Sequence, residues 1–160
     1  MRVDVSLLVQ LQRLAVVFLI LMPTSAHPTD EVTQTHDYAI AQIRITPTNS
    51  ETPITLSVRL AVTPSQQAYG LMFSPPLPAQ SGMLFLFEDM KPRTFWMKNT
   101  PIALDMLFFD DSGRLVALIS NAKPTTLTLR HSRVAAKYVL EIGGREASRL
   151  NIKIGSRLHL

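Results

Sequence analysis

The sequence predicts a mainly β protein at the border of the α+β class: a compact antiparallel sheet curled into a partly open barrel, with one short helix. Three observations support this fold class. About eight short segments alternate apolar and polar residues, or are apolar over the length of a strand. Clusters of Pro, Gly, Asn, Asp and Ser separate these segments at short intervals. A capping signal for a helix stands at Thr63.

Residues 1–26 have the layout of a secretory signal peptide. Arg2 and Arg13 give a basic start, residues 14–22 are an unbroken apolar run, and Ala26 ends a small-residue cleavage site. We expect cleavage after Ala26 and a periplasmic or secreted protein. The alternative is an uncleaved N-terminal anchor, because Asp4 weakens the basic start. Residues 27–37 are polar and predict a flexible lead, which leaves residues 38–160 as a single β-rich domain.

Composition argues against several function classes. Sixteen Lys and Arg against 12 Asp and Glu give a formal net charge of +4. The densest basic group, residues 130–137, is too sparse for a stripe that binds nucleic acid. The sequence has no cysteine, which excludes disulfides and a thiol nucleophile. The four histidines lack metal-ligand spacing, so we expect neither a metal nor a cofactor. No second apolar segment is long enough to span a membrane.

The first half of the domain is predicted as two strands and a helix. Residues 38–45 form the first strand, and a turn rich in Pro and hydroxyl side chains follows. Residues 54–62 alternate strictly between apolar and polar side chains, which is typical of a half-buried strand. Thr63 and Gln66 form a capping box around Pro64, and Gly70 ends the predicted helix after about two turns.

The second half is predicted as a series of hairpins. A buried strand at 82–87 leads into a polar turn at 88–93, and strands at about 95–98 and 102–109 flank a Thr-Pro turn. The sequence Asp-Asp-Ser-Gly at 110–113 predicts a hairpin turn that pairs residues 114–119 with the strand before it. Further strands are expected at 126–129, 136–142 and 152–160, with one helical turn at 146–150.

The strand at 102–109 contains the main candidate site. It is apolar on both faces except for Asp105, which predicts a central strand covered on both sides. Lys98 and Asn99 lie across the Thr-Pro turn and are predicted to reach Asp105. In one interpretation these three side chains only satisfy one another inside the fold. In the other, Trp96 joins them to form a pocket for a polar ligand such as a sugar. The sequence leaves both interpretations open.

Glu141 poses the same question in the apolar strand at 136–142. Together with Asp105 it would supply a general acid and base for glycoside cleavage, provided that both lie in one cleft. We assign no catalytic residue on this basis. The candidate ligand-binding residues are Trp96, Lys98, Asn99, Asp105 and Glu141.

Several sequence blocks together resemble a known family. The blocks are Gly70-Leu71-Met72, Gly82-Met83-Leu84-Phe85, Phe95-Trp96-Met97-Lys98-Asn99-Thr100, Leu104-Asp105, Tyr138-Val139-Leu140-Glu141 and Ile154-Gly155. In this order, over about residues 54–158, they are similar to domain-of-unknown-function family 192, also called uncharacterised protein family 0127. The resemblance implies a compact β-rich domain, often exported or membrane-attached, with no established activity or cofactor. Ser74 is a departure, because the family usually has an arginine at that position.

Together these observations predict an exported, non-enzymatic binding or accessory module for a small polar ligand or a cell-envelope component. Two alternatives stay open. One is an envelope glycan hydrolase that uses Asp105 and Glu141. The other is a purely structural or partner-binding module, in which the central polar residues only stabilise the barrel.

Overall fold

Seven strands and two short helices make up the part of the chain that the computed structural model describes, residues 37–160. In chain order they are β1 (Ile40–Thr46), β2 (Ile54–Ala61), α2 (Pro64–Tyr69), β3 (Ser81–Phe95), β4 (Leu104–Phe109), β5 (Leu115–Ala122), β6 (Arg130–Gly143), α3 (Glu146–Arg149) and β7 (Arg157–His159). The predicted signal peptide at 1–26 and the predicted lead up to residue 36 lie outside the described residues.

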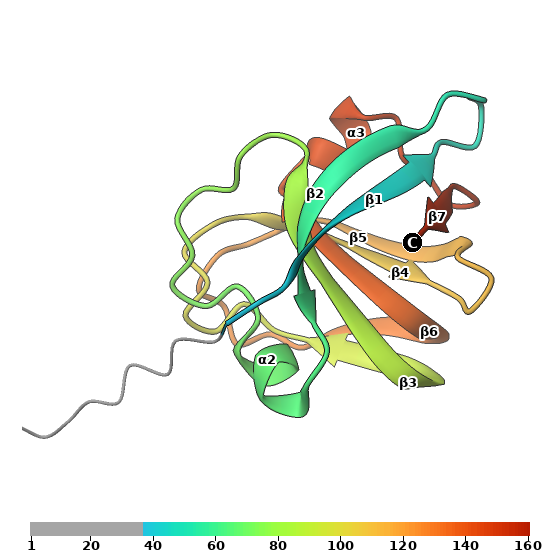
Figure 1. Cartoon of the computed structure of the whole chain (residues 1–160). Coiled ribbons are helices and arrows are strands. Elements are labelled where there is room, and N and C mark those ends of the chain that lie inside the picture. The colour runs from blue at the N-terminus through green and yellow to red at the C-terminus, as the bar shows by residue number, and fades with distance from the viewer. Residues whose placement is uncertain (1–36) are drawn as a thin grey trace, which may run out of the picture. The chain divides into compact units, whose positions relative to one another are not determined.

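The strands form one curled sheet in the order β5-β4-β6-β3-β2-β1-β7 (Figure 1). At one end its two edges meet. Leu115 N–H donates to the carbonyl of Ser156 at 2.8 Å, and Leu158 N–H donates to that of Gly113 at 2.7 Å. An isolated bridge between Arg114 and Arg157 lies beside these bonds. The sheet is therefore a half-barrel closed at one end only, and the predicted fold class is confirmed.

One pair of strands differs from the antiparallel prediction. β2 and β3 are parallel, with Val58 opposite Gly82. A parallel pair needs a crossover rather than a hairpin, and the segment between these strands contains α2 and a proline-rich loop. α2 itself is as predicted. The Thr63 hydroxyl accepts from Gln66 N–H at 3.2 Å, and the Gln66 amide oxygen accepts from Thr63 N–H at 3.0 Å.

The two faces of the sheet bury two separate apolar clusters. The barrel cluster is inside the curl and includes Leu84, Leu107 and Leu140. The pocket cluster is on the other face of the same strands and includes Phe85 and Phe108. Every residue of β4 is buried, so the prediction of a central strand covered on both sides is confirmed. Successive β4 side chains alternate between the two clusters.

β3 and β6 form a long bent ribbon that covers the pocket cluster (Figure 1). Their register shifts between Leu86 and Lys91, where four β3 residues face a single β6 residue, Lys137. The Lys137 ammonium donates to the carbonyl of Glu88 at 2.7 Å. The prediction of a polar turn at 88–93 is therefore wrong. Those polar residues form the bend within one continuous strand.

The strand predicted at 95–98 does not form, so the hairpin predicted across the Thr-Pro turn is also wrong. β3 ends at Phe95, β4 begins at Leu104, and residues 96–103 form a loop. Asn99 has a φ of 52° within this loop, a left-handed conformation that departs from regular strand geometry. No strand forms at 126–129, because these residues form a second loop that leads into β6 at Arg130.

Candidate functional site

A pocket of about 460 Å³ lies between the C-terminal end of α2 and the bent ribbon of β3 and β6. Three of the five candidate residues line it: Trp96, Lys98 and Glu141. The other lining residues are mainly aromatic and apolar, and they are Gln67, Ala68, Tyr69, Gly70, Leu71, Met72, Phe85, Phe87, Pro92, Arg93, Thr94, Phe95 and Thr100. The volume suits a small ligand.

Glu141 is the acidic residue of this pocket. It lies on β6 between Met83 of β3 and Met106 of β4, and its side chain is only 4% exposed. No hydrogen bond or ion pair from residues 37–160 reaches its carboxyl group. Every fully buried side-chain oxygen in that range has a hydrogen-bond partner, so the two unpartnered oxygens of Glu141 are not fully buried. The carboxyl oxygens therefore open onto the pocket. Burial raises the pKa of Glu141 to about 8, so the group is mainly protonated at neutral pH and can donate a hydrogen bond.

The wall next to Glu141 is made of packed aromatic rings. Phe95 packs edge-on against Phe85, with ring centroids 5.1 Å apart, and against Phe108 at 5.9 Å. Trp96, the residue after Phe95, is 44% exposed and lines the same pocket. The Lys98 ammonium lies 5.2 Å from the centroid of the Trp96 ring. An aromatic plate and a cation therefore lie next to one another in the lining.

Arg93 is a lining residue that the sequence reasoning missed. Its guanidinium lies 3.9 Å from the centroid of the Phe87 ring, donates to Asp89 Oδ1 at 2.7 Å and donates to the carbonyl of Ala136 at 3.0 Å. These contacts make Arg93 a fixed part of the pocket wall. It escaped notice because residues 88–93 read as a solvated turn, whereas the bend of β3 brings them over the pocket cluster.

Asp105 has a different environment from the one predicted. Its carboxylate is fully buried and accepts three backbone N–H groups: Asn121 at 2.7 Å, Arg145 at 3.0 Å and Ala147 at 2.8 Å. The predicted pairing with Lys98 and Asn99 is therefore wrong. Asp105 does stabilise the fold, but through main-chain donors that a sequence cannot locate. It joins the end of β5 to the start of α3.

Asp105 and Glu141 do not share a cleft. Asp105 is opposite Ile142 in the β4–β6 ladder, and Met106 is opposite Glu141. Directly opposed residues point to the same face, so side chains offset by one position point to opposite faces. Asp105 thus belongs to the side of the barrel cluster and Glu141 to the side of the pocket cluster. The two carboxyl groups therefore cannot flank one glycosidic bond, as a two-carboxylate hydrolase requires.

Asn99, the fifth candidate residue, and Ser74 both lie outside the pocket lining. The Asn99 side chain is exposed, and its amide is 4.0 Å from the sulfur of Met72. Ser74, the departure from the family pattern, is buried outside the pocket lining and accepts from Arg59 at 3.3 Å. Within residues 37–160, no cluster of three or more His, Asp or Glu is placed to hold a metal ion. No helix in this range is long and apolar enough to cross a membrane.

The fold and the pocket define a small β half-barrel with a ligand-sized cavity on the outer face of its sheet, an architecture that does not by itself specify an activity. The chain belongs to the family DUF192, described as "Uncharacterized ACR", whose family model matches residues 44–160. The resemblance seen in the sequence is confirmed. Among curated proteins, none matches this chain.

Two crystal structures share the fold. One is of a candidate transcription regulator from Sinorhizobium meliloti 1021, with 36% sequence identity and a TM-score of 0.74, covering 77% of this chain and 95% of that one. The other is of a protein of unknown function from Novosphingobium aromaticivorans DSM 12444. It has 34% identity and a TM-score of 0.74, and covers 84% of this chain and 90% of that one.

Proposed function

We propose that this protein is an exported, non-enzymatic module that binds a small polar ligand in the pocket at Glu141. The observation that carries the proposal is the Glu141 carboxyl group, which is buried, open to the pocket and without a partner among residues 37–160. Burying a carboxyl group without a partner costs stability. We therefore infer that the carboxyl group forms a hydrogen bond with a ligand in the pocket.

The lining indicates which ligands fit. A protonated carboxyl group donates one hydrogen bond and accepts others. The aromatic wall and the Trp96 ring suit a ligand with an apolar face, and Lys98 beside Trp96 suits an acceptor or an anionic group. Sugars of the cell envelope combine hydroxyl groups with an apolar ring face. N-acetylglucosamine and muramyl dipeptide are therefore the first probes.

Binding is favoured over hydrolysis because Glu141 is the only carboxylic side chain among the pocket-lining residues that the structure describes. Glycoside cleavage ordinarily needs two carboxyl groups flanking one bond, and Asp105 is on the opposite face of the sheet with its oxygens occupied. The structural alternative accounts for Asp105 but leaves Glu141 unexplained.

Three full-length variants test the proposal. Glu141→Gln keeps a neutral hydrogen-bond donor, Glu141→Leu removes the polar group, and Glu88→Leu is the control outside the pocket lining. We expect calorimetric titration with the two probes at pH 7 to show binding by the wild type, Glu141→Gln and Glu88→Leu. Glu141→Leu should bind about tenfold more weakly or worse.

Stability separates a site from a structural role. Because no group in the described part of the chain pairs with the Glu141 carboxyl, Glu141→Leu should be at least as stable as the wild type in urea. A loss of stability in Glu141→Leu, together with no binding of either probe by any variant, would contradict the proposal.

A further inference from the structure

Three loops lie together at one end of the half-barrel: residues 70–80, 96–103 and 123–129, which we call the loop end (Figure 1, left). Backbone hydrogen bonds join them. Phe73 N–H donates to the carbonyl of Asn99 at 2.7 Å, Met97 N–H to that of Thr126 at 3.0 Å, and Thr125 N–H to that of Thr100 at 3.0 Å. The three loops therefore form one connected surface.

Each of these loops contains a residue held in the left-handed region of backbone space. They are Phe73 at φ 58°, Asn99 at φ 52° and Thr125 at φ 54°. A β-branched threonine or a bulky phenylalanine rarely adopts this conformation, and strain of this kind persists where the surroundings fix it. All three residues take part in the bonds between loops, so the loop end has a set shape.

That shape exposes four large apolar side chains: Phe73 is 66% exposed, Trp96 44%, Leu127 67% and Leu129 55%. Arg130 holds the loop at 123–129 in place, since its guanidinium donates to the carbonyl of Thr128 at 2.9 Å and to the Thr126 hydroxyl at 2.8 Å. A single exposed leucine needs no explanation, but four large apolar side chains on three connected loops indicate an interaction surface.

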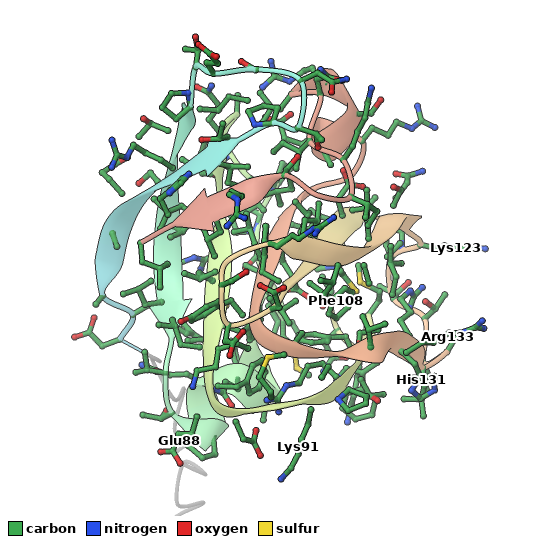
Figure 2. All side chains as sticks on the ribbon, turned by 90° about the vertical axis from the view of Figure 1, so that its right-hand side faces the viewer. Glu88, Lys91, Phe108, Lys123, His131 and Arg133 are labelled. Atoms are coloured by element: carbon green, nitrogen blue, oxygen red, sulfur yellow. The ribbon has the colours of Figure 1, made fainter. Side chains whose placement is uncertain are left out.

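The charge of this surface has one sign. The three loops and the start of β6, residues 130–134, contain Lys98, Lys123, Arg130, Arg133 and His131 but no Asp or Glu. Figure 2 shows Lys123, His131 and Arg133 along one edge of the molecule and Glu88 on the other side. No carboxylate within residues 37–160 forms an ion pair with these basic side chains. Exposed aromatic and leucine side chains beside such basic charge are typical of proteins that bind at a lipid interface.

We propose that the loop end docks onto the surface of an anionic lipid bilayer. Phe73, Trp96, Leu127 and Leu129 enter the interface, while Lys98, Lys123 and Arg133 contact the phosphate groups of the lipids. A bilayer fits better than a protein partner because the apolar side chains belong to separate loops with cations among them. Docking needs no ligand in the pocket. It would bring the pocket residues Trp96 and Lys98 to the bilayer.

The full-length protein and its single tryptophan provide the test. Vesicles of phosphatidylglycerol and phosphatidylethanolamine, with bromine on the upper acyl chains, quench a tryptophan only when it lies within the interface. We expect these vesicles to quench and blue-shift Trp96 emission, and phosphatidylcholine vesicles to do so about tenfold less or weaker. Salt at about 0.5 M should reduce the quenching. Vesicle binding that leaves Trp96 unquenched would show attachment through the N-terminal segment alone, and it would contradict docking by the loop end.

Paired variants locate the contact. The double variant Leu127→Ser, Leu129→Ser should partition onto the anionic vesicles at least about tenfold more weakly. Each substitution removes the free energy gained when a leucine side chain moves from water into the interface. The control is Ile154→Ser, since Ile154 is also an exposed apolar residue, at 53%. It lies away from the loop end, because the N–H of the next residue, Gly155, donates to the carbonyl of Leu115 at the opposite end of β5. Equal quenching of the wild type and the double variant would overturn the proposal. So would an unquenched wild type that instead binds duplex DNA or an acidic protein.

Discussion

Replacing Asp105 with asparagine should destabilise the fold more than any other single carboxylate change in the described chain. Its two oxygens accept three backbone N–H groups, from Asn121, Arg145 and Ala147, at a site with no exposure. An amide has only one oxygen. If that oxygen keeps Asn121 and Arg145, the new NH₂ group faces the Ala147 N–H, and two donors then meet without an acceptor.

The magnitude follows from these three bonds. A hydrogen bond to a charged acceptor contributes about 1.5–3 kcal/mol, and a neutral acceptor contributes about 1 kcal/mol. Asp105→Asn loses one charged bond, weakens two others and leaves a buried donor unsatisfied. We therefore expect a loss of about 3–5 kcal/mol in the free energy of unfolding. That is a large share of the roughly 5–15 kcal/mol that stabilises a typical domain.

Urea unfolding of the full-length protein, followed by Trp96 fluorescence, measures this loss. Asp110→Asn is the matched control. The Asp110 carboxylate accepts Ser112 N–H and Arg114 N–H, both at 2.9 Å, but lies in a partly exposed hairpin turn. It should lose only about 1 kcal/mol. If Asp105→Asn were no less stable than Asp110→Asn, the three buried bonds would not be what Asp105 contributes.

Three further perturbations follow from the contacts. Burial raises the pKa of Glu141 from 4.5 to about 8, so between these pH values the folded state holds a proton that the unfolded state has released. The free energy of unfolding therefore falls by about 1.4 kcal/mol per pH unit as pH rises from 4.5 to 8. Glu141→Gln should remove this slope in urea titrations; an unchanged slope would exclude Glu141 as its source. Gly82→Ala should cost about 2–3 kcal/mol in the same assay, because the new Cβ would lie 2.3 Å from the carbonyl oxygen of Glu141. Gly143→Ala, with nothing within 4 Å, is its control and should cost far less. Thr63→Ala should cost about 1 kcal/mol through the lost helix cap, and no change in the urea midpoint would contradict the capping role.

The sequence predicted the elements that depend on local chemistry. The capping box at Thr63, the hairpin turn after β4 and the fully buried β4 strand are all set by residues close together in the chain. The parallel pairing of β2 with β3 and the bend of β3 depend on contacts between distant segments. Local polarity at 88–93 therefore suggested a turn where the structure has a paired, bulged strand.

Only part of the site was predicted, because the rest depends on contacts between distant segments. Sequence alone identified Trp96, Lys98 and Glu141 as residues that needed an explanation, and the structure places all three in one pocket. The sequence-based prediction assigned the wrong partners to Asp105, because a buried carboxylate is usually paired with a cation. The actual partners are three main-chain N–H groups, and every residue type except proline carries such a donor.

The central claim is that Glu141 presents a protonated carboxyl group to the pocket at neutral pH. Carbon-13 NMR of the full-length protein, with the side-chain carboxyl carbon of glutamate labelled, tests it most directly. Glu141→Gln identifies the resonance by its disappearance. The structure predicts a titration midpoint near 8 for this resonance and a change in its shift at pH 7 on binding of N-acetylglucosamine or muramyl dipeptide. A midpoint near the ordinary glutamate value of 4.5 would contradict the claim.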